Sequence, residues 1–430
     1  MFLTVLPAFS YAQIDTTQHI LKIQDLFSLA KAHSKELGIS NEAIGISKKQ
    51  TEIAKAERLP EVEAGLKYGY LSDAFVWDHT LSNRERAAIP HISTDFSIEA
   101  SQILYKGNAI TNNIKKSELA EQLAQLNYDQ DTQDILFLLA GKYFDLYRSY
   151  NQQKVYRQNI ELAKKRLDNI RKLRTEGMVT QNDIVRSELQ LTNLQTELED
   201  VGNDITIINR ELCTVLGFPL DTKLQVDSTL DSAGQQSAGF GNILAEASAT
   251  NPAIKASTVK ELMADRDIAI AKAARRPVIS LYAGDALSRP FLYSLPPMDI
   301  YMSFFQAGIK INYNISSLYH AKHHIDLARL EYGRQQKATE LVREKTDLAV
   351  HQAFVKWEEA KSDYAAYEKS FDLANDNYRI VESKYYNQFA VLTDILDAST
   401  AKLNAGLALS NAKANILFRW YQLQKAVGKL

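Results

Sequence analysis

The chain has 430 residues, and only 9 of them are proline and 17 are glycine. Both residue types are scarcer than in average proteins, which argues against collagen-like, disordered and all-β sandwich chains. Its 50 Lys and Arg residues nearly balance its 52 Asp and Glu residues, so no basic excess points to a nucleic-acid partner.

The first residues resemble the end of an export signal. Residues 1–12 read MFLTVLPAFSYA, an apolar run that ends in Ser10-Tyr11-Ala12, close to a small-x-Ala cleavage site. The basic segment that normally precedes such a run is missing, so a disordered apolar tail stays an alternative. We expect residues 1–12 to be a signal peptide remnant, and the mature chain, from about Gln13, to be exported.

The rest of the sequence repeats one plan twice. The segment IAKAERLP at 53–60 is matched by IAKAARRP at 270–277. We therefore predict a first structural repeat at 20–218 and a second at 241–430. Between them, residues 219–240 are rich in Asp, Ser and Gly and are predicted to be a connector.

Each repeat is predicted to hold a helix that ends before a proline, two strands, a very long helix and a last helix. Long helices are possible because 91–218 and 298–430 contain no proline, which costs about 3 kcal/mol or more inside a helix. In the first repeat we expect a helix at 21–58, strands at 61–71 and 92–105, the long helix at 107–175 and the last helix at 181–217. In the second we expect a helix at 242–275, strands at 278–287 and 300–314, the long helix at 317–386 and the last helix at 393–428.

The long helices carry a coiled-coil pattern. In the second repeat, apolar residues recur at alternating spacings of three and four, which predicts left-handed supercoiled packing against partner helices. We expect these side chains to form a packed core rather than a cofactor site. The stripe consists of Val350, Ala353, Trp357, Ala360, Tyr364, Tyr367, Phe371, Ala374, Tyr378, Val381 and Tyr385.

The predicted strands alternate between an apolar and a polar face. From Glu61, for example, Val62, Ala64 and Leu66 lie on one face, and Glu63, Gly65 and Lys67 on the other. Each strand has about ten residues, the length that crosses a bilayer at a tilt. A soluble, half-buried sheet gives the same alternation and stays an alternative. Because four strands cannot close a barrel and open edges cannot lie in lipid, several chains must pool their strands; a trimer would supply twelve.

At this point a family resemblance is clear. It rests on the duplicated plan and on the two turns between the long and the last helices. These turns are RTEGMVTQNDIV at 174–185 and YYNQFAVLTDILDA at 385–398. The chain resembles the TolC family of bacterial outer membrane efflux proteins. The resemblance implies a mainly α fold with a small β part. Duplicated long coiled-coil helical hairpins would form an α-barrel, and four strands per chain would join a trimeric twelve-stranded transmembrane β-barrel.

The resemblance also implies a function. The chain would form a homotrimeric outer membrane channel, surrounded by outer membrane lipid, with a helical tunnel in the periplasm. It would be the passive exit duct of a tripartite efflux or type I secretion system, gated at the periplasmic helix tips. Its partners would be a periplasmic adaptor protein and an inner-membrane transporter, with no nucleic acid. An exported or peripheral coiled-coil scaffold without a channel stays an alternative.

We expect no enzyme activity, no cofactor and no metal site. The sequence contains no Gly-rich phosphate loop and no Ser-His-Asp order that would mark a catalytic site. Its single cysteine, Cys213, excludes an intrachain disulfide and a Cys-based zinc cluster.

The resemblance assigns roles to residues of the two turns. The pore constriction falls on Asp394 and Asp397, and the gate contacts on Tyr385 and Asp183. The family's gating arginine is replaced by Ala390, which puts a salt-bridge latch there in doubt. Asp183 and Asp394 could instead simply favour helix N-termini, where acidic side chains bond exposed N–H groups. Adaptor docking falls on Glu176, Gly177, Met178, Val179, Thr180, Phe389, Ala390 and Val391.

Overall fold

The computed structural model describes residues 19–227, 239–294 and 297–430. The predicted signal remnant at 1–12 lies outside the described residues, and so does the 228–238 part of the connector. The chain divides into two compact units. We call Met1–Asn41, Leu126–Lys255 and Val342–Leu430 the tip unit, and Glu42–Gln125 with Ala256–Leu341 the sheet unit.

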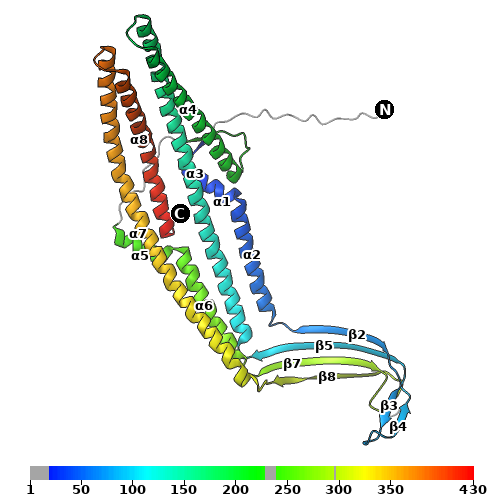
Figure 1. The fold of residues 1–430 in the computed structure, drawn as a ribbon. Coiled ribbons are helices and arrows are strands. Elements are labelled where there is room, and N and C mark those ends of the chain that lie inside the picture. The colour runs from blue at the N-terminus through cyan, green and yellow to red at the C-terminus, as the bar shows by residue number, and fades with distance from the viewer. Residues whose placement is uncertain (1–18, 228–238, 295–296) are drawn as a thin grey trace, which may run out of the picture. The chain divides into compact units, whose positions relative to one another are not determined.

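The described part of the chain is mainly helical with a small strand part, which confirms the predicted fold class (Figure 1). Among its helices, none combines the length and the apolarity that crossing a membrane requires. The helices are α1 (Ile23–His33), α2 (Lys35–Ala56), α3 (Ala109–Thr175), α4 (Gln181–Leu216), α5 (Phe240–Thr250), α6 (Pro252–Ala273), α7 (Ser317–Tyr386) and α8 (Leu392–Val427). The strands are β1 (His19–Leu21), β2 (Glu61–Tyr70), β3 (Ala74–Trp77), β4 (Arg84–Ala87), β5 (Ile92–Lys106), β6 (Leu224–Val226), β7 (Val278–Arg289) and β8 (Met302–Asn312).

The first helix of each repeat is broken, whereas the sequence predicted continuous helices at 21–58 and 242–275. Ser34 separates α1 from α2, and its hydroxyl oxygen accepts a hydrogen bond from the backbone N–H of Leu37 at 3.4 Å. Asn251 separates α5 from α6, and its Oδ1 accepts a hydrogen bond from the N–H of Ala253 at 2.9 Å. Each break is therefore a new helix start, capped by the kind of short polar side chain that favours this position.

The last helix of each repeat ends against one of these breaks. Gly217 follows α4 with a φ of 76°, and Gly428 follows α8 with a φ of 91°. A side chain at Gly217 would meet the ring of His33 at the end of α1. At Gly428, Asn251 holds the end of α8 through a 2.9 Å hydrogen bond from its Nδ2 to the carbonyl of Ala426. The close approach and the left-handed backbone both require glycine.

The core of the tip unit is a series of apolar clusters along its helices. The largest joins α1, α3, α4 and β6 around Leu26, Leu136, Phe144 and Leu212, all nearly inaccessible to solvent. The predicted stripe of α7 is buried at both ends, and its middle is half-buried or exposed in a single chain, with Tyr367 41% exposed. Beside it, a mainly apolar groove of about 630 Å³ runs along α3, α7 and α8.

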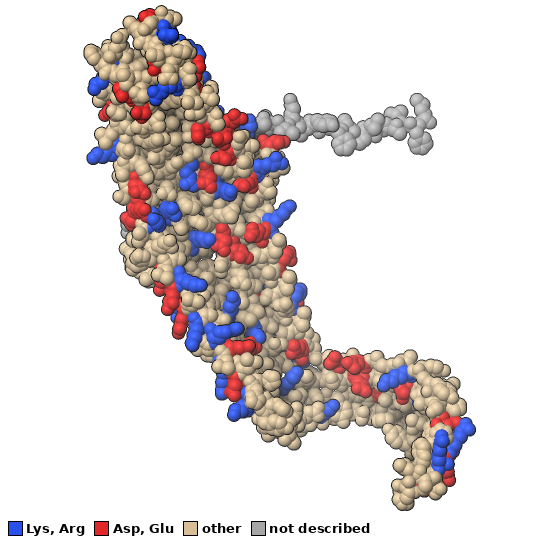
Figure 2. Space-filling view, viewed as in Figure 1, with Lys and Arg blue, Asp and Glu red and all other residues tan. Residues whose placement is uncertain are grey.

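The main sheet of the sheet unit is antiparallel, in the order β2-β5-β7-β8. The edges of β2 and β8 have no strand partner within the described residues. One face is apolar and open: Val62, Leu66 and Tyr68 are 66%, 71% and 73% exposed. Figure 2 shows that acidic and basic side chains are interspersed over the visible helices. The short hairpin of β3 and β4, inserted between β2 and β5, was not predicted.

Gly428 should tolerate no side chain. The Gly428→Ala variant would hold a left-handed backbone at a cost of about 1–2 kcal/mol, with its Cβ 2.7 Å from the Cα of Asn251. We expect a lower thermal unfolding midpoint for the detergent-solubilised protein. Gly202→Ala is the matched control, because nothing lies within 4 Å of its Cβ and an alanine in a helix gains about 0.5–1 kcal/mol. Equal midpoints for the two variants would contradict this account of the α8 end.

Candidate functional site

The candidate site lies at the two turns of the tip unit, where α3 turns into α4 and α7 turns into α8. After α3, Gly177 adopts a φ of 77°, and the N–H of Met178 donates to the carbonyl of Leu173 at 2.9 Å. After α7, Gln388 adopts the same conformation with a φ of 64°, and the N–H of Phe389 donates to the carbonyl of Lys384 at 2.8 Å. The two turns have one geometry, although only the first has the glycine that this backbone favours.

Asp183 takes part in a capping box at the start of α4. Its Oδ2 accepts hydrogen bonds from the backbone N–H of Thr180 at 2.7 Å and from the Thr180 hydroxyl at 2.8 Å. In return, the Thr180 hydroxyl oxygen accepts the N–H of Asp183 at 3.3 Å. The helix-start role considered for Asp183 is thus present in the single chain, and its carboxylate satisfies backbone groups that the helix leaves unpaired.

Asp394 has the same position in α8 but a weaker cap. Its Oδ2 accepts the backbone N–H of Val391 at 3.1 Å, and the valine side chain offers no acceptor in return. Asp397 follows three residues later on the same exposed helix face. Within the described residues, Asp397 has no hydrogen-bond or ion-pair partner. Both carboxylates therefore face solvent together, and only Asp394 also has a structural task.

Tyr385 is buried beneath the second turn, with 6% of its surface exposed, and its hydroxyl has no hydrogen-bond partner among the described residues. The predicted bond to Asp183 is not formed in this single chain, where the Asp183 carboxylate bonds Thr180 instead. Burial, with the Asp183 carboxylate as the next cause, raises the pKa of Tyr385. The hydroxyl is therefore neutral at physiological pH and free to donate.

A buried arginine below the tips was missed at the sequence level. Arg166 of α3 is 3% exposed, and its Nη2 donates to Gln190 Oε1 of α4 at 2.7 Å. Its Nη1 has no partner among the described residues. Burial lowers the pKa of Arg166, while the nearby Tyr378 and other polar groups of α7 oppose that shift. Its spacing could have indicated burial, because Arg166 lies three residues after Ala163 and four before Ile170, which are both buried on the same face of α3.

The predicted docking residues divide into exposed and packed groups. Met178, Phe389 and Val391 are 54%, 82% and 62% exposed, although all three are apolar. Val179 and Ala390 instead pack against the apolar cluster that closes the tips. Gln388 joins the two turns, because its side-chain amide donates to the sulfur of Met178 at 3.5 Å. The tip is thus a small apolar surface with exposed carboxylates beside it; none of the described residues form a group suited to hold a metal ion.

Comparison with known proteins gives consistent matches along both repeats. The sequence family described as outer membrane efflux protein matches residues 26–218 and 243–429. The outer membrane efflux protein BepC of Brucella suis biovar 1 (strain 1330) is 21% identical over 410 residues, which cover 94% of this chain and 85% of that protein.

Two solved structures show the same fold. VceC of Vibrio cholerae superposes with a TM-score of 0.77 at 15% identity, over 94% of this chain and 96% of that one. The outer membrane channel CmeC of Campylobacter jejuni superposes with a TM-score of 0.77 at 15% identity, over 98% of this chain and 90% of that one. At such low identity these structures establish the fold alone.

Removing the hydroxyl of Tyr385 should not destabilise the fold of a dissociated single chain at neutral pH. In Tyr385→Phe an unpaired buried polar atom disappears, so the thermal midpoint should stay equal or rise. Because the folded-state pKa of Tyr385 lies above the ordinary 10.0, the unfolded chain ionises first, and the parent protein loses stability as the pH rises from 10 through the raised value. The advantage of the variant should therefore grow above pH 10.

The matched control is Tyr386→Phe, which removes the acceptor of a 3.2 Å hydrogen bond from Asn169 Nδ2. It should lower stability by about 0.5–1.5 kcal/mol. A clear loss of stability in Tyr385→Phe at pH 7 would show that the hydroxyl has a partner.

Proposed function

Because the chain belongs to the outer membrane efflux protein family, we propose that three copies of it form the outer membrane exit duct of a tripartite efflux or type I secretion system. Members of this family are channels and not enzymes, in agreement with the expected lack of catalysis. The observation that carries the proposal is the four-stranded sheet, whose apolar face is open and whose two edges are unpaired.

The unpaired strand edges support the trimer. β2 leads out of α2 and β8 leads into α7, so the two edge strands run in opposite directions. Lipid offers no hydrogen bonds to a strand edge, and a closed barrel is the arrangement that pairs every strand. Pairing the β8 edge of one copy with the β2 edge of the next satisfies both edges. Three copies would then form a closed barrel of twelve strands.

Exposed apolar residues on two helices also support the proposed trimer. α2 exposes Ile39, Ile46 and Ile53, which recur at seven-residue spacing and are 74%, 59% and 67% exposed. α7 exposes Leu341, Leu348 and Val355 at the same spacing, 49%, 70% and 47% exposed. Apolar residues at heptad spacing pack against other helices in coiled coils. We infer that these two stripes meet between neighbouring copies and continue the duct as a helical tunnel into the periplasm.

The tips supply the proposed gate. Asp394 and Asp397 would form two stacked acidic rings in a trimer, one near the turn and one about a helical turn away. Such rings attract cations and hinder anions. The free hydroxyl of Tyr385 is available to bond Asp183 when the gate is closed. Ala390 offers no salt bridge, so closure would depend on this hydrogen bond and on apolar packing.

The same tips are the proposed docking surface for a periplasmic adaptor protein, which would join the duct to an inner-membrane transporter. Met178, Phe389 and Val391 are exposed apolar side chains on adjacent turns. Exposed apolar patches on soluble surfaces mark interaction sites. The apolar groove along α3, α7 and α8 is a separate surface, several helical turns from the tips.

Cell fractionation tests the duct against a coiled-coil scaffold. The open apolar face of the sheet requires lipid, so the protein should be recovered with outer membranes and should need detergent for extraction. Recovery in the soluble fraction without detergent would favour the scaffold and overturn the duct.

Replacing both Asp394 and Asp397 by Ala should raise single-channel conductance in planar bilayers and reduce cation preference. The reason is that both acidic rings disappear from the proposed constriction. Asp204→Ala is the matched control, because this exposed acid lies in the middle of α4, away from the turns. Recordings that match the parent protein in both respects would contradict the ring assignment.

A further inference from the structure

The hairpin of β3 and β4 presents an aromatic face. The register pairs Phe75 with Arg86 and Trp77 with Arg84, so these four side chains project from one side. Phe75 is 41% and Trp77 47% exposed. The guanidinium carbon of Arg84 lies 3.6 Å from the Phe75 ring centroid and 5.9 Å from that of Trp77. Arg84 has no carboxylate partner among the described residues, so planar groups dominate this surface, which we call the hairpin face.

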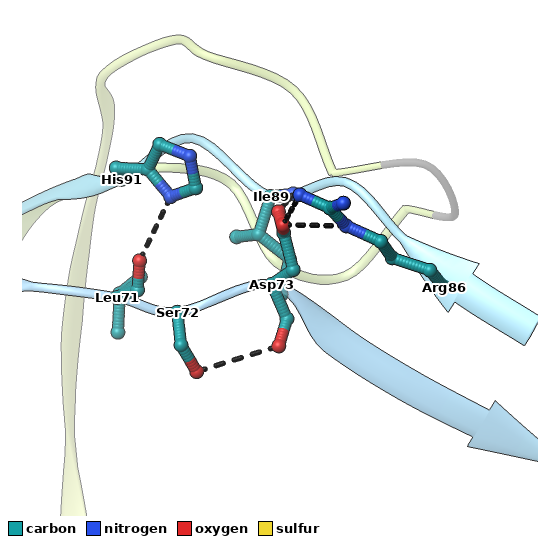
Figure 3. Close-up of polar contacts among 6 residues, drawn as sticks. All are labelled: Leu71, Ser72, Asp73, Arg86, Ile89 and His91. Atoms are coloured by element: carbon teal, nitrogen blue, oxygen red, sulfur yellow. Dashed lines mark hydrogen bonds and ion pairs between the residues drawn. The ribbon is translucent and has the colours of Figure 1, made fainter.

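Polar contacts close the base of the hairpin, next to the ends of β2 and β5 (Figure 3). The Asp73 carboxylate accepts Nε of Arg86 at 2.7 Å and the backbone N–H of Ile89 at 3.3 Å. Arg86 also bonds Asp73 through Nη2 and holds the pKa of that carboxyl below its ordinary value. Directly after β2, the N–H of Leu71 donates to the carbonyl of His91, which precedes β5, at 2.9 Å. The hairpin face therefore has a defined place relative to β2.

The far end of the hairpin is equally ordered. The Asp78 carboxylate accepts the backbone N–H groups of Thr80 at 3.0 Å and Ser82 at 3.1 Å, and the side-chain amide of Asn83 at 2.8 Å. These bonds, led by that from the Thr80 hydroxyl, lower the pKa of Asp78 to about 2. A rigid surface loses little conformational entropy on binding, which favours a specific contact.

A second apolar surface lies at the same end of the sheet, on the loop between β7 and β8. An antiparallel β-bridge between Phe291 and Met298 sets its geometry. An ion pair also does so, in which Arg289 donates from Nε at 2.7 Å and from Nη2 at 3.0 Å to the Asp299 carboxylate. We call its exposed apolar side chains the loop patch. They are Leu292 at 53%, Tyr293 at 88%, Met298 at 44%, Ile300 at 48% and Tyr301 at 54% exposed.

The strand order decides which surfaces can meet. The hairpin follows β2 at one edge of the sheet, and the loop patch precedes β8 at the other edge. Both connections are at the end of the strands opposite the helices. When the β2 edge of one copy pairs with the β8 edge of the next, its hairpin lies as near in strand order to the neighbour's loop patch as to the loop patch of its own chain. Within one chain the two surfaces do not cover each other, because Trp77 and Tyr293 stay 47% and 88% exposed. The contact joins two different surfaces and repeats around a closed ring.

We propose that the hairpin face of each copy packs against the loop patch of the neighbouring copy, forming a clasp between subunits at the outer end of the barrel. This inference rests on the proposed trimer. The tilted rings of Phe75 and Trp77, and the Arg84 guanidinium that has no acidic partner among the described residues, fit a surface that offers the exposed ring of Tyr293. Tyr301, in the same patch, already has the Arg289 guanidinium over its ring. The clasp would cover apolar side chains that are otherwise left in water, and would set the register between β2 and β8 of adjacent chains.

Site-directed cross-linking tests the clasp. The variant W77C and Y293C, in a C213A background, is purified in detergent and treated with a short bismaleimide. Denaturing gels should show covalent dimers and trimers when both cysteines are present, and monomers for either cysteine alone. V76C with Y293C is the matched control, because Val76 projects from the opposite side of the hairpin and should cross-link far less.

The oligomeric state of the uncross-linked protein, measured by native mass spectrometry, separates the two hypotheses. A monomeric parent protein would overturn the proposed trimer. A trimeric parent whose W77C and Y293C variant remains monomeric on denaturing gels, or cross-links no better than the V76C control, would overturn the clasp alone.

A second measurement avoids the cross-linker. W77A and Y293A should each lower the temperature at which the trimer dissociates, and the double variant should lose little more than the worse single variant, because both remove one contact. V76A should have a smaller effect. Fully additive losses would overturn the clasp, as would a W77A variant that keeps parental trimer stability but binds less lipopolysaccharide, which would indicate a lipid partner.

Discussion

The constraint on which the structure depends is the pairing of backbone groups along two strand edges. A lone β2-β5-β7-β8 sheet leaves the edges of β2 and β8 unpaired and its apolar face open. In water the open apolar face is unfavourable and the free edges are a template for pairing with other chains, and in lipid the unpaired backbone groups have no hydrogen-bond partner at all. In the proposed trimer, pairing the edges between copies would resolve both problems at once. It would also bring the helices and loops that continue from the edge strands against those of the neighbouring copy.

At the tips, carboxylates that stabilise the fold locally are the same ones to which the proposed gate assigns a channel function. Asp183 and Asp394 satisfy N–H groups at the starts of α4 and α8, a role that is complete in one chain. The first tip has a glycine turn and a reciprocal cap, whereas the second has Gln388 at positive φ and a valine that cannot cap. The second tip therefore has fewer local hydrogen bonds to hold it and depends more on burial of Tyr385.

Periodicity made most of the fold predictable. The three-and-four spacing from Val350 to Tyr385 marks a helix, and the alternation after Glu61 marks a strand, because both patterns extend over many residues. Short-range features were harder to predict. The breaks at Ser34 and Asn251 depend on single capping side chains, although Asn251 before Pro252 was a usable signal. The β3–β4 hairpin was missed because its strands are too short for alternation to be visible.

The sequence by itself determined the duplicated plan, the long helices, the alternating strands and the family, since these depend on residue spacing and on motifs that are local in the chain. Only the tertiary structure decided that the hydroxyl of Tyr385 is buried without a hydrogen-bond partner among the described residues, that Arg166 is buried below the tips, and that β2 and β8 are the open edges. The physical reason is that hydrogen-bond partners, burial and strand order arise between residues far apart in sequence, where spacing along the chain carries no information.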